Sequence, residues 1–361
     1  MELGIIGLPN SGKTTIFNAL TASQAATSAI SSGKFETHVA TVTVPDPRVD
    51  RLSRMFQPRK TTFARIQFND IAGLQRGITR NGGLNGALLT QLSQNNALVH
   101  VVRAFEDGRV PHSEGEVSPT RDIDTLDEEL ILSDLSIIER RIERLEHSLS
   151  KSKNGEREVY LAEKTLLLKL SASLEQEIPI RDLDLNPTEE KMTRGFQFMT
   201  AKPVLLVLNS GDNGGDRAFD FRTYRHRRAA TVHLKGSLEA EIAQLDAEDA
   251  RAFLAEYGIK EPGLQRAIRL AYELLGLISF FTVGEDEVRA WTVNRGANAV
   301  NAAGAIHTDL ARGFICAEVI HYDDLIASGS LAAARQRGLL RLEGRDYIIQ
   351  DGDVVNIRFN V

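Results

Sequence analysis

A phosphate-binding loop is encoded near the start of the sequence. Residues 7–14 read Gly-Leu-Pro-Asn-Ser-Gly-Lys-Thr, which fits the pattern G-x-x-x-x-G-K-[ST]. The glycines let successive backbone N–H groups turn inward around phosphate oxygens, and the start of the following helix adds partial positive charge. Lys13 can reach the β- and γ-phosphates as a point charge, and the Thr14 hydroxyl can ligate Mg²⁺. The motif predicts a nucleotide site. The alternative is a chance match, which the strand-like run before it and the helical pattern after it disfavour.

A second candidate element is the segment Asp70-Ile71-Ala72-Gly73, which ends the apolar run 66–69. A carboxylate at a strand end downstream of a phosphate loop is typical of a residue that holds Mg²⁺ directly or through water. The N–H of Gly73 can then face the γ-phosphate. The alternative is a turn or a helix cap, the usual role of an Asp at a strand end. The preceding strand favours the metal role.

A base-reading element is predicted where Asn209-Ser210-Gly211-Asp212 follows the apolar run 203–208. It resembles the N-K-x-D element of GTPases, with Ser210 at the lysine position. A carboxylate at Asp212 can accept hydrogen bonds from guanine N1–H and the exocyclic amine, a donor pair that adenine lacks. The alternative is a polar turn after a strand.

The elements that must position these residues are apolar strands alternating with helical patterns, which indicates an α/β domain with a mostly parallel sheet. Strand-like runs occur at 3–6, 39–44, 64–68, 98–102 and 204–208. Residues 21–38 are rich in Ala, Ser and Thr with little periodicity, and are predicted to form a loop.

An inserted helical hairpin is predicted within residues 122–190. Apolar residues recur with spacings of three and four over 135–149, a polar break follows at 151–155, and a second such run covers 159–174. The alternative is two ordinary surface helices of the same domain. From residue 280 onward, short strands and turns predict a small α+β domain. We therefore expect four segments, which are a P-loop domain in two parts (1–121 and 191–279), the hairpin (122–190) and a C-terminal domain (280–361).

Composition limits the classes of protein that remain. The 361 residues are 42% hydrophobic and 25% charged, which excludes a disordered or fibrous chain. A single cysteine, Cys316, cannot form an internal disulfide and gives no indication of an oxidising compartment. No signal-peptide pattern and no apolar run of about 18 residues occur, so we predict a cytoplasmic protein without membrane contact. The net charge of -6 does not favour a globally basic nucleic-acid binder.

Several of these motifs together resemble the YchF-type Obg-like ATPases, nearly from end to end. The resemblance is carried by segments 7–20, 70–74, 101–105, 121–123, 287–292, 303–309 and 346–348. It implies a P-loop domain of the Obg–HflX type, the helical hairpin and a C-terminal TGS (ubiquitin-like) domain. It also implies slow, Mg²⁺-dependent hydrolysis of ATP and contact with the large ribosomal subunit.

Site residues follow from the resemblance by position. The phosphate-wrapping residues would be Asn10, Ser11, Gly12, Lys13, Thr14 and Thr15. Thr14 and Asp70 would hold Mg²⁺, and Lys13 would stabilise the developing charge. Leu74 occupies the place of the catalytic Gln of Ras-like proteins and cannot orient water. The family's substitute is a histidine, which falls on His112. An ordinary surface histidine is the alternative for that residue.

Three positions depart from the family pattern. Lys34 stands where the family has a switch threonine, and a lysine has no acceptor with which to ligate Mg²⁺. Asp212 replaces the Glu that usually ends the base-reading element, a change toward the GTPase pattern. The segment 81–86 lacks the family's acidic switch residue. GTP therefore stays open as a second nucleotide, and altered switch chemistry is expected.

Two basic clusters, at 48–60 and 217–228, are either solvated faces or contacts for RNA phosphates. The sequence thus predicts a monomeric, cytoplasmic nucleoside triphosphatase that acts as a conformational switch, with the ribosome and RNA as candidate partners. The main alternative is a ribosome- or RNA-binding module whose nucleotide site senses without turnover. A metabolic kinase is a third option, disfavoured because no acceptor-substrate motif is found.

Overall fold

The structure is a computed structural model of the whole chain. It describes residues 1–22, 27–32, 35–71, 86–151, 153–211, 220, 223–256, 259 and 261–360. These residues form two compact units. The first unit comprises Met1–Thr41 and Gln67–Ala267, and the second comprises Val42–Ile66 and Ile268–Val361. Among the described residues, no helix combines the length and the apolar character needed to cross a membrane.

The first unit is built on a seven-stranded sheet with the order β2-β3-β5-β1-β6-β7-β8. Its parallel strands are β1 (Glu2–Ile6), β5 (Arg65–Asp70), β6 (Ala97–Arg103), β7 (Val204–Asn209) and β8 (Ala229–Leu234). Every residue of β6 and β7 is buried, as expected of central parallel strands covered on both faces. The predicted α/β class with a mostly parallel sheet is confirmed.

The edge of this sheet corrects one prediction. Residues 21–38 were expected to form a loop, but β2 (Thr27–Ser32) pairs antiparallel with β3 (Phe35–Thr43). Strand β2 contains Thr and Ser and β3 contains three Thr, and at a sheet edge the cross-strand backbone hydrogen bonds can outweigh the weak apolar pattern.

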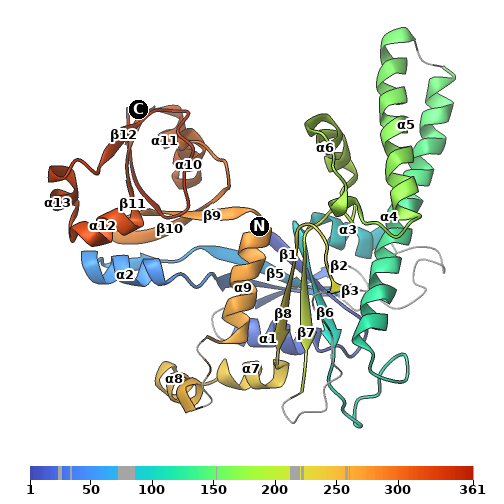
Figure 1. The fold of residues 1–361 in the computed structure, drawn as a ribbon, viewed down its shortest axis with the longest axis horizontal. Helices are drawn as coiled ribbons and strands as arrows, with labels where there is room; N and C mark the ends of the chain where they lie inside the picture. The colour runs from blue at the N-terminus through green and yellow to red at the C-terminus, as the bar shows by residue number, and fades with distance from the viewer. Residues whose placement is uncertain are drawn as a thin grey trace. The chain divides into compact units, whose positions relative to one another are not determined.

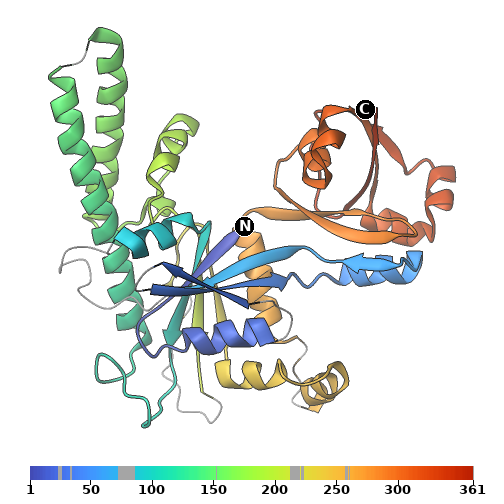
Figure 2. The same ribbon diagram turned by 180° about the vertical axis from the view of Figure 1, so that it is seen from behind.

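Helices cover the sheet and connect its strands. They are α1 (Lys13–Ala22), α3 (Gly86–Gln94), α7 (Gly236–Ile242), α8 (Ala247–Glu256) and α9 (Gly263–Leu274), the last of which continues into the second unit. Helices α1 and α7 pack side by side (Figures 1 and 2). Leu88 and Leu92 of α3 share one core cluster with Ile6 and Leu98 of the central strands.

A long antiparallel hairpin consists of α4 (Pro119–Leu149) and α5 (Asn154–Leu174), and it extends away from the sheet (Figure 1). The first half of α4 packs on the sheet through Leu126 and Leu130, and its second half packs on α5. The predicted hairpin is confirmed. Short elements return the chain to β7, namely η1 (Ile180–Asp182), α6 (Pro187–Thr193) and η2 (Arg194–Phe196).

The second unit contains a six-stranded sheet with the order β12-β11-β13-β9-β10-β4. Its strands are β4 (Lys60–Thr62), β9 (Leu277–Thr282), β10 (Glu287–Asn294), β11 (Phe314–His321), β12 (Arg341–Glu343) and β13 (Asp353–Phe359). Its helices are α2 (Pro47–Phe56), α10 (Ala299–Ile306), α11 (Thr308–Arg312), α12 (Tyr322–Ser328) and α13 (Leu331–Gln336). This α+β arrangement agrees with the predicted C-terminal domain.

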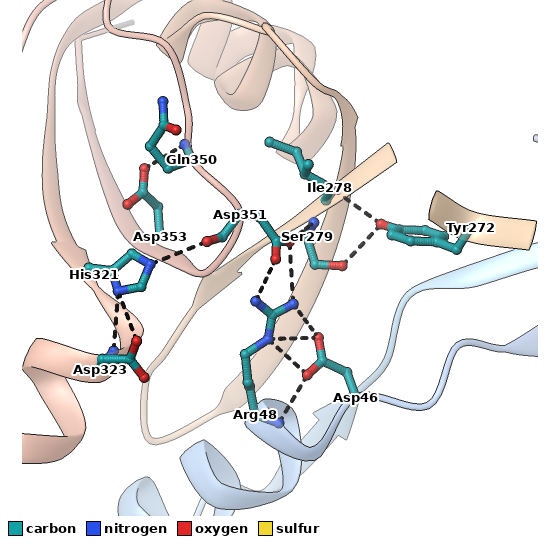
Figure 3. Close-up of polar contacts among 10 residues, drawn as sticks. All are labelled: Asp46, Arg48, Tyr272, Ile278, Ser279, His321, Asp323, Gln350, Asp351 and Asp353. Carbon is teal, nitrogen blue, oxygen red and sulfur yellow. Dashed lines mark hydrogen bonds and ion pairs between the residues drawn. The ribbon is translucent and has the colours of Figure 1, made fainter. Parts of the chain in front are cut away.

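The sequence did not predict that residues 42–66 fold with the C-terminal part of the chain. Strand β4 pairs with β10, and Arg48 of α2 donates to Asp46 and, 303 positions away, to Asp351 (Figure 3). The Oδ1 atom of Asp351 accepts the backbone N–H of Ser279 at 2.9 Å. The four-segment division of the chain stays a prediction.

Candidate functional site

The candidate residues gather at one edge of the first unit's sheet because each follows a neighbouring parallel strand. The phosphate loop follows β1, Asp70 ends β5, Arg103 ends β6 and Asn209 ends β7. The carboxyl ends of parallel strands are the usual place for ligands in such sheets. The fold therefore brings together residues that lie far apart in the sequence.

The phosphate loop needs glycine at two described positions. The backbone of Gly7 has φ +154°, and a Cβ there would lie 2.3 Å from the carbonyl oxygen of Val101. The backbone of Gly12 has φ +91°, and a Cβ there would lie 2.1 Å from Nδ2 of Asn209. Asn10 between them also has a left-handed backbone, with φ 62°. This tight winding points backbone N–H groups toward a common centre.

Lys13 is buried inside this loop. Its Nζ donates to the carbonyl oxygens of Gly7 at 3.0 Å and Leu8 at 2.9 Å. Burial lowers the pKa of Lys13 to about 8, and the nearby charge of Asp70 opposes that shift. The ammonium is thus held by weak carbonyl partners, and a phosphate would supply a better counter-charge.

Thr14 and Asp70 form an oxygen-rich pair beside Lys13. The Thr14 hydroxyl donates to Oδ2 of Asp70 at 3.3 Å. Burial raises the pKa of Asp70, while Lys13 and Thr14 act to lower it. A hydroxyl and a carboxylate are hard oxygen donors of the kind that Mg²⁺ takes together with waters and phosphate oxygens. The residues present therefore fit the predicted metal.

The remaining loop residues are arranged for a ligand. Thr14 and Thr15 are exposed at the first turn of α1. Ser11 is buried, and its Oγ has no hydrogen-bond partner among the described residues. A buried hydroxyl without a partner costs free energy, which a ligand's acceptor would offset.

Asn209 lies beside the phosphate loop, and both polar atoms of its side chain are hydrogen-bonded to the protein. Its Nδ2 donates to the carbonyl oxygen of Ser11 at 3.0 Å, and its Oδ1 accepts the N–H of Gly236 at 3.0 Å. Ser210 is buried, and its Oγ is hydrogen-bonded to Nε2 of His233. Asn209 thus clamps the phosphate loop to the start of α7. Sequence reasoning missed Gly236. Its position, just after a strand and at the start of a helix, was the signal that could have found it.

His112 lies beside the phosphate loop but is enclosed. Asn10 donates from Nδ2 to the carbonyl oxygen of the preceding residue, Pro111, at 3.2 Å. The His112 side chain is only 2% exposed, and its Nε2 lies 2.8 Å from Oδ2 of Asp122. Its Nδ1 accepts the backbone N–H of Glu114 at 3.1 Å. The alternative of an ordinary surface histidine is therefore not what the structure shows.

Arg103 is a second residue that sequence reasoning missed. It is 2% exposed and donates to the carbonyl oxygens of Phe105 at 3.0 Å and Val110 at 2.8 Å. Its Nη1 lies 3.4 Å from the carbonyl oxygen of Asn10, so it joins the segment before His112 to the phosphate loop. The signal was a charged residue at the end of a mostly apolar strand.

Several predicted positions lie outside the described residues. These are Lys34, Gly73, Leu74, the segment 81–85 and Asp212. Among the described residues, no group of three or more His, Cys, Asp or Glu side chains could hold a metal ion by itself.

Comparison with known proteins covers the whole chain. Residues 277–360 match the family model of the YchF C-terminal domain, described as a protein of unknown function (DUF933), and residues 2–143 match that of a 50S ribosome-binding GTPase. The ribosome-binding ATPase YchF of Bacillus subtilis is 40% identical over 368 aligned residues, with 100% of both chains covered. The protein of the same name from Escherichia coli O157:H7 is also 40% identical, over 100% of this chain and 99% of the relative.

A solved structure shares the fold. The YchF GTPase of Schizosaccharomyces pombe superposes with a TM-score of 0.83 at 28% identity, over 99% of this chain and 97% of the other. Sequence, domain content and fold thus agree over the full length, and the chain belongs to the YchF family of P-loop proteins.

Proposed function

We propose that this protein is an Mg²⁺-dependent nucleoside triphosphatase that hydrolyses ATP slowly and works as a conformational switch. The observation that carries the proposal is the arrangement of Lys13, Thr14 and Asp70 around a tightly wound phosphate loop. The names of the bacterial relatives, which describe an ATPase, support the reaction and the nucleotide.

Each residue of the site has a role in this proposal. Asn10, Ser11, Gly12 and Thr15 line the loop that wraps the phosphates, and Lys13 neutralises charge on the β- and γ-oxygens. Thr14 and Asp70 would hold Mg²⁺, which supplies further neutralisation of phosphate charge when bound. The N–H of Gly73 would face the γ-phosphate, so that hydrolysis releases the segment that follows β5.

His112 is the proposed group that acts on the attacking water. It adjoins the phosphate loop through Pro111, and the loop around it is held by Arg103. The enclosed position of its imidazole is consistent with slow turnover in the isolated protein, because the ring must move before it can contact water at the phosphate.

ATP is the proposed nucleotide, with GTP as the alternative. The clamp made by Asn209 and the burial of Ser210 leave the base to be read by other groups, among which Asp212 is the candidate for guanine. Titration with non-hydrolysable ATP and GTP analogues in Mg²⁺ decides between them. Tighter ATP binding supports the proposal, and tighter GTP binding would assign guanine recognition to Asp212.

Ribosome association is proposed from the names of the relatives and of the N-terminal family model, and a contact with the large subunit from the latter. RNA is a further candidate partner. The two basic clusters give only weak support for RNA binding, because their residues Arg48, Arg59 and Arg227 are paired with carboxylates of the protein. A cytoplasmic location and a monomeric state complete the proposal, and co-sedimentation with ribosomes tests its first part.

The rate of ATP hydrolysis distinguishes an enzyme from the alternative, a ribosome- or RNA-binding module whose nucleotide site only senses nucleotide. We expect Mg²⁺-dependent release of phosphate from ATP that is abolished in Lys13→Ala. If the wild-type rate equals that of the Lys13→Ala control while the wild type still binds nucleotide tightly, the site senses nucleotide without hydrolysing it.

A further inference from the structure

The imidazole of His112 has both ring nitrogens occupied by the protein. A backbone N–H can only donate, so the Nδ1 atom that faces Glu114 at 3.1 Å carries no proton. The proton therefore resides on Nε2, which donates to Oδ2 of Asp122 at 2.8 Å. In this position neither nitrogen is free to accept a proton from water or to orient it.

Asp122 is itself held firmly. Its Oδ1 accepts Nε of Arg121 at 3.1 Å and Nη2 of the same guanidinium at 2.8 Å. Arg121 also donates to the carbonyl oxygen of Glu116 at 2.7 Å, across the turn that follows His112. The Asp122 side chain is only 4% exposed, and it lies in the first turn of α4, where a carboxylate is favoured by the helix dipole.

This geometry differs from that of a histidine that an aspartate orients for catalysis. In such a pair one ring nitrogen contacts the carboxylate and the other faces the reacting group. Here the second nitrogen faces the backbone N–H of Glu114 at 3.1 Å and Nη2 of Arg121 at 3.5 Å, and the side chain is 2% exposed. Both ring nitrogens are thus engaged by protein groups, and the imidazole would have to leave this position to act on water.

We propose that Asp122, supported by Arg121, is a positioning residue that holds His112 in a stored conformation, from which the imidazole must be released before hydrolysis. This inference rests on the proposed role of His112. Most molecules then carry the stored imidazole, so the observed kcat is the intrinsic rate multiplied by the small released fraction.

The test is a double-mutant cycle in the full-length protein with saturating Mg²⁺ and ATP. Asp122→Asn removes the charge that His112 faces and should raise kcat about tenfold, because hydrogen bonds to charged groups shift equilibria by roughly that factor or more. The KM for ATP should change little, since the Asp122 carboxylate is hydrogen-bonded to His112 and Arg121, neither of which belongs to the phosphate loop. The gain should vanish in the His112→Ala/Asp122→Asn double variant.

Asp134→Asn is the matched control. Asp134 is another buried aspartate of α4, but it accepts hydrogen bonds from Met199 and Thr200 and does not contact His112. It should leave kcat unchanged. An equal rise of kcat in this control would assign the effect to loosening of α4 and overturn the proposal.

Chemical modification gives a readout that needs no variant to fold. Diethyl pyrocarbonate should modify His112 of the wild-type protein much more slowly than His307, whose side chain is 64% exposed. Asp122→Asn should accelerate the modification of His112. If wild-type His112 reacts as fast as His307, the stored conformation is not the populated one and the proposal fails.

The outcomes separate this inference from the proposed function. A fall of kcat in Asp122→Asn would mean that Asp122 orients a catalytic histidine, and an unchanged kcat would mean a purely structural contact. Either result overturns storage while His112→Ala still reports whether His112 takes part. If His112→Ala hydrolyses ATP at the wild-type rate, the proposed role of His112 fails first.

Discussion

At the scale of single residues, the site is shaped by the hydrogen bonds that its side chains make to other groups of the protein. Lys13 donates to carbonyl oxygens of its own loop, and the Asn209 side chain is hydrogen-bonded to both Ser11 and Gly236. The sequence predicted which residues gather here, because motif spacing and strand ends determine that. It could not predict that Asn209 and His112 already have protein partners, since those partners lie in other segments of the chain.

The protonation of Lys13 makes nucleotide binding depend on pH. Its pKa of about 8 in the free protein means that the side chain is increasingly neutral above that pH. Phosphate binding requires the charged form, so binding takes up a proton and Kd should rise, by up to about tenfold per pH unit, between about pH 8 and pH 9.5. Titration with a non-hydrolysable ATP analogue measures this. Lys13→Arg keeps its charge and should give a flat profile, whereas a flat wild-type profile would contradict the assignment.

The clamp made by Asn209 predicts a loss of affinity without a change of specificity. Asn209→Ala removes one hydrogen bond to Ser11 and one from Gly236, each worth about 1 kcal/mol. Binding of ATP and GTP analogues should weaken together, by about tenfold or somewhat more, because the loop loses its support while the base contacts stay. Equilibrium titration of both analogues checks this. A changed ratio of the two affinities would show that Asn209 reads the base.

At the scale of elements, the spacing of apolar residues predicted secondary structure correctly where an element packs along its whole length. The spacing of apolar residues correctly predicted α4 and α5, because their contact surface follows the helix repeat. The same criterion found the end of β3 (residues 39–43) but failed for residues 27–32 and 35–38, where β2 and the start of β3 form an edge hairpin whose stability comes from backbone pairing. Edge strands need no alternating pattern of apolar residues, so their sequence carries a weaker signal.

Asp134 anchors the hairpin and links its stability to pH. This fully buried carboxylate accepts the N–H groups of Met199 and Thr200 and the Thr200 hydroxyl, and burial raises its pKa from 3.8 to about 6. The folded state then binds more protons than the unfolded state between those values. This contribution to the free energy of unfolding therefore falls as pH rises from about 4 to about 6, by roughly 3 kcal/mol in total.

Comparison with Asp134→Asn isolates this effect. The variant has no titrating group at the site. The unfolding free energy of the wild type should therefore fall relative to that of the variant as pH rises through this range. Urea unfolding at several pH values measures it. A constant difference would show that the carboxyl titrates normally when buried.

At the scale of the whole molecule, the least predictable feature is the chain path. The chain leaves the first unit near the end of β3, contributes α2 and β4 to the second unit within residues 42–66, and returns within β5, which ends at Asp70. Nothing local in the sequence indicates this path, because the contacts that determine it join Arg48 to Asp351 and β4 to β10. Motifs predict what a site contains, whereas such long-range pairings emerge only with the fold.

The Arg48 network should therefore hold residues 42–66 in the second unit. Arg48 contacts Asp46 and Asp351 and lies 5.1 Å from the ring centre of Phe281 (Figure 3 shows the two ion pairs). Because these groups are partly exposed, Arg48→Ala should cost only about 1–2 kcal/mol. Hydrogen exchange should nevertheless accelerate in α2, which loses its contact with Asp351, and in β4, which packs against α2. Arg59→Ala removes a pair whose side chains are 85% and 87% exposed, and it should change neither exchange nor stability measurably. Equal acceleration in both variants, or none in Arg48→Ala, would mean that the strand pairing of β4 with β10 suffices to hold the segment.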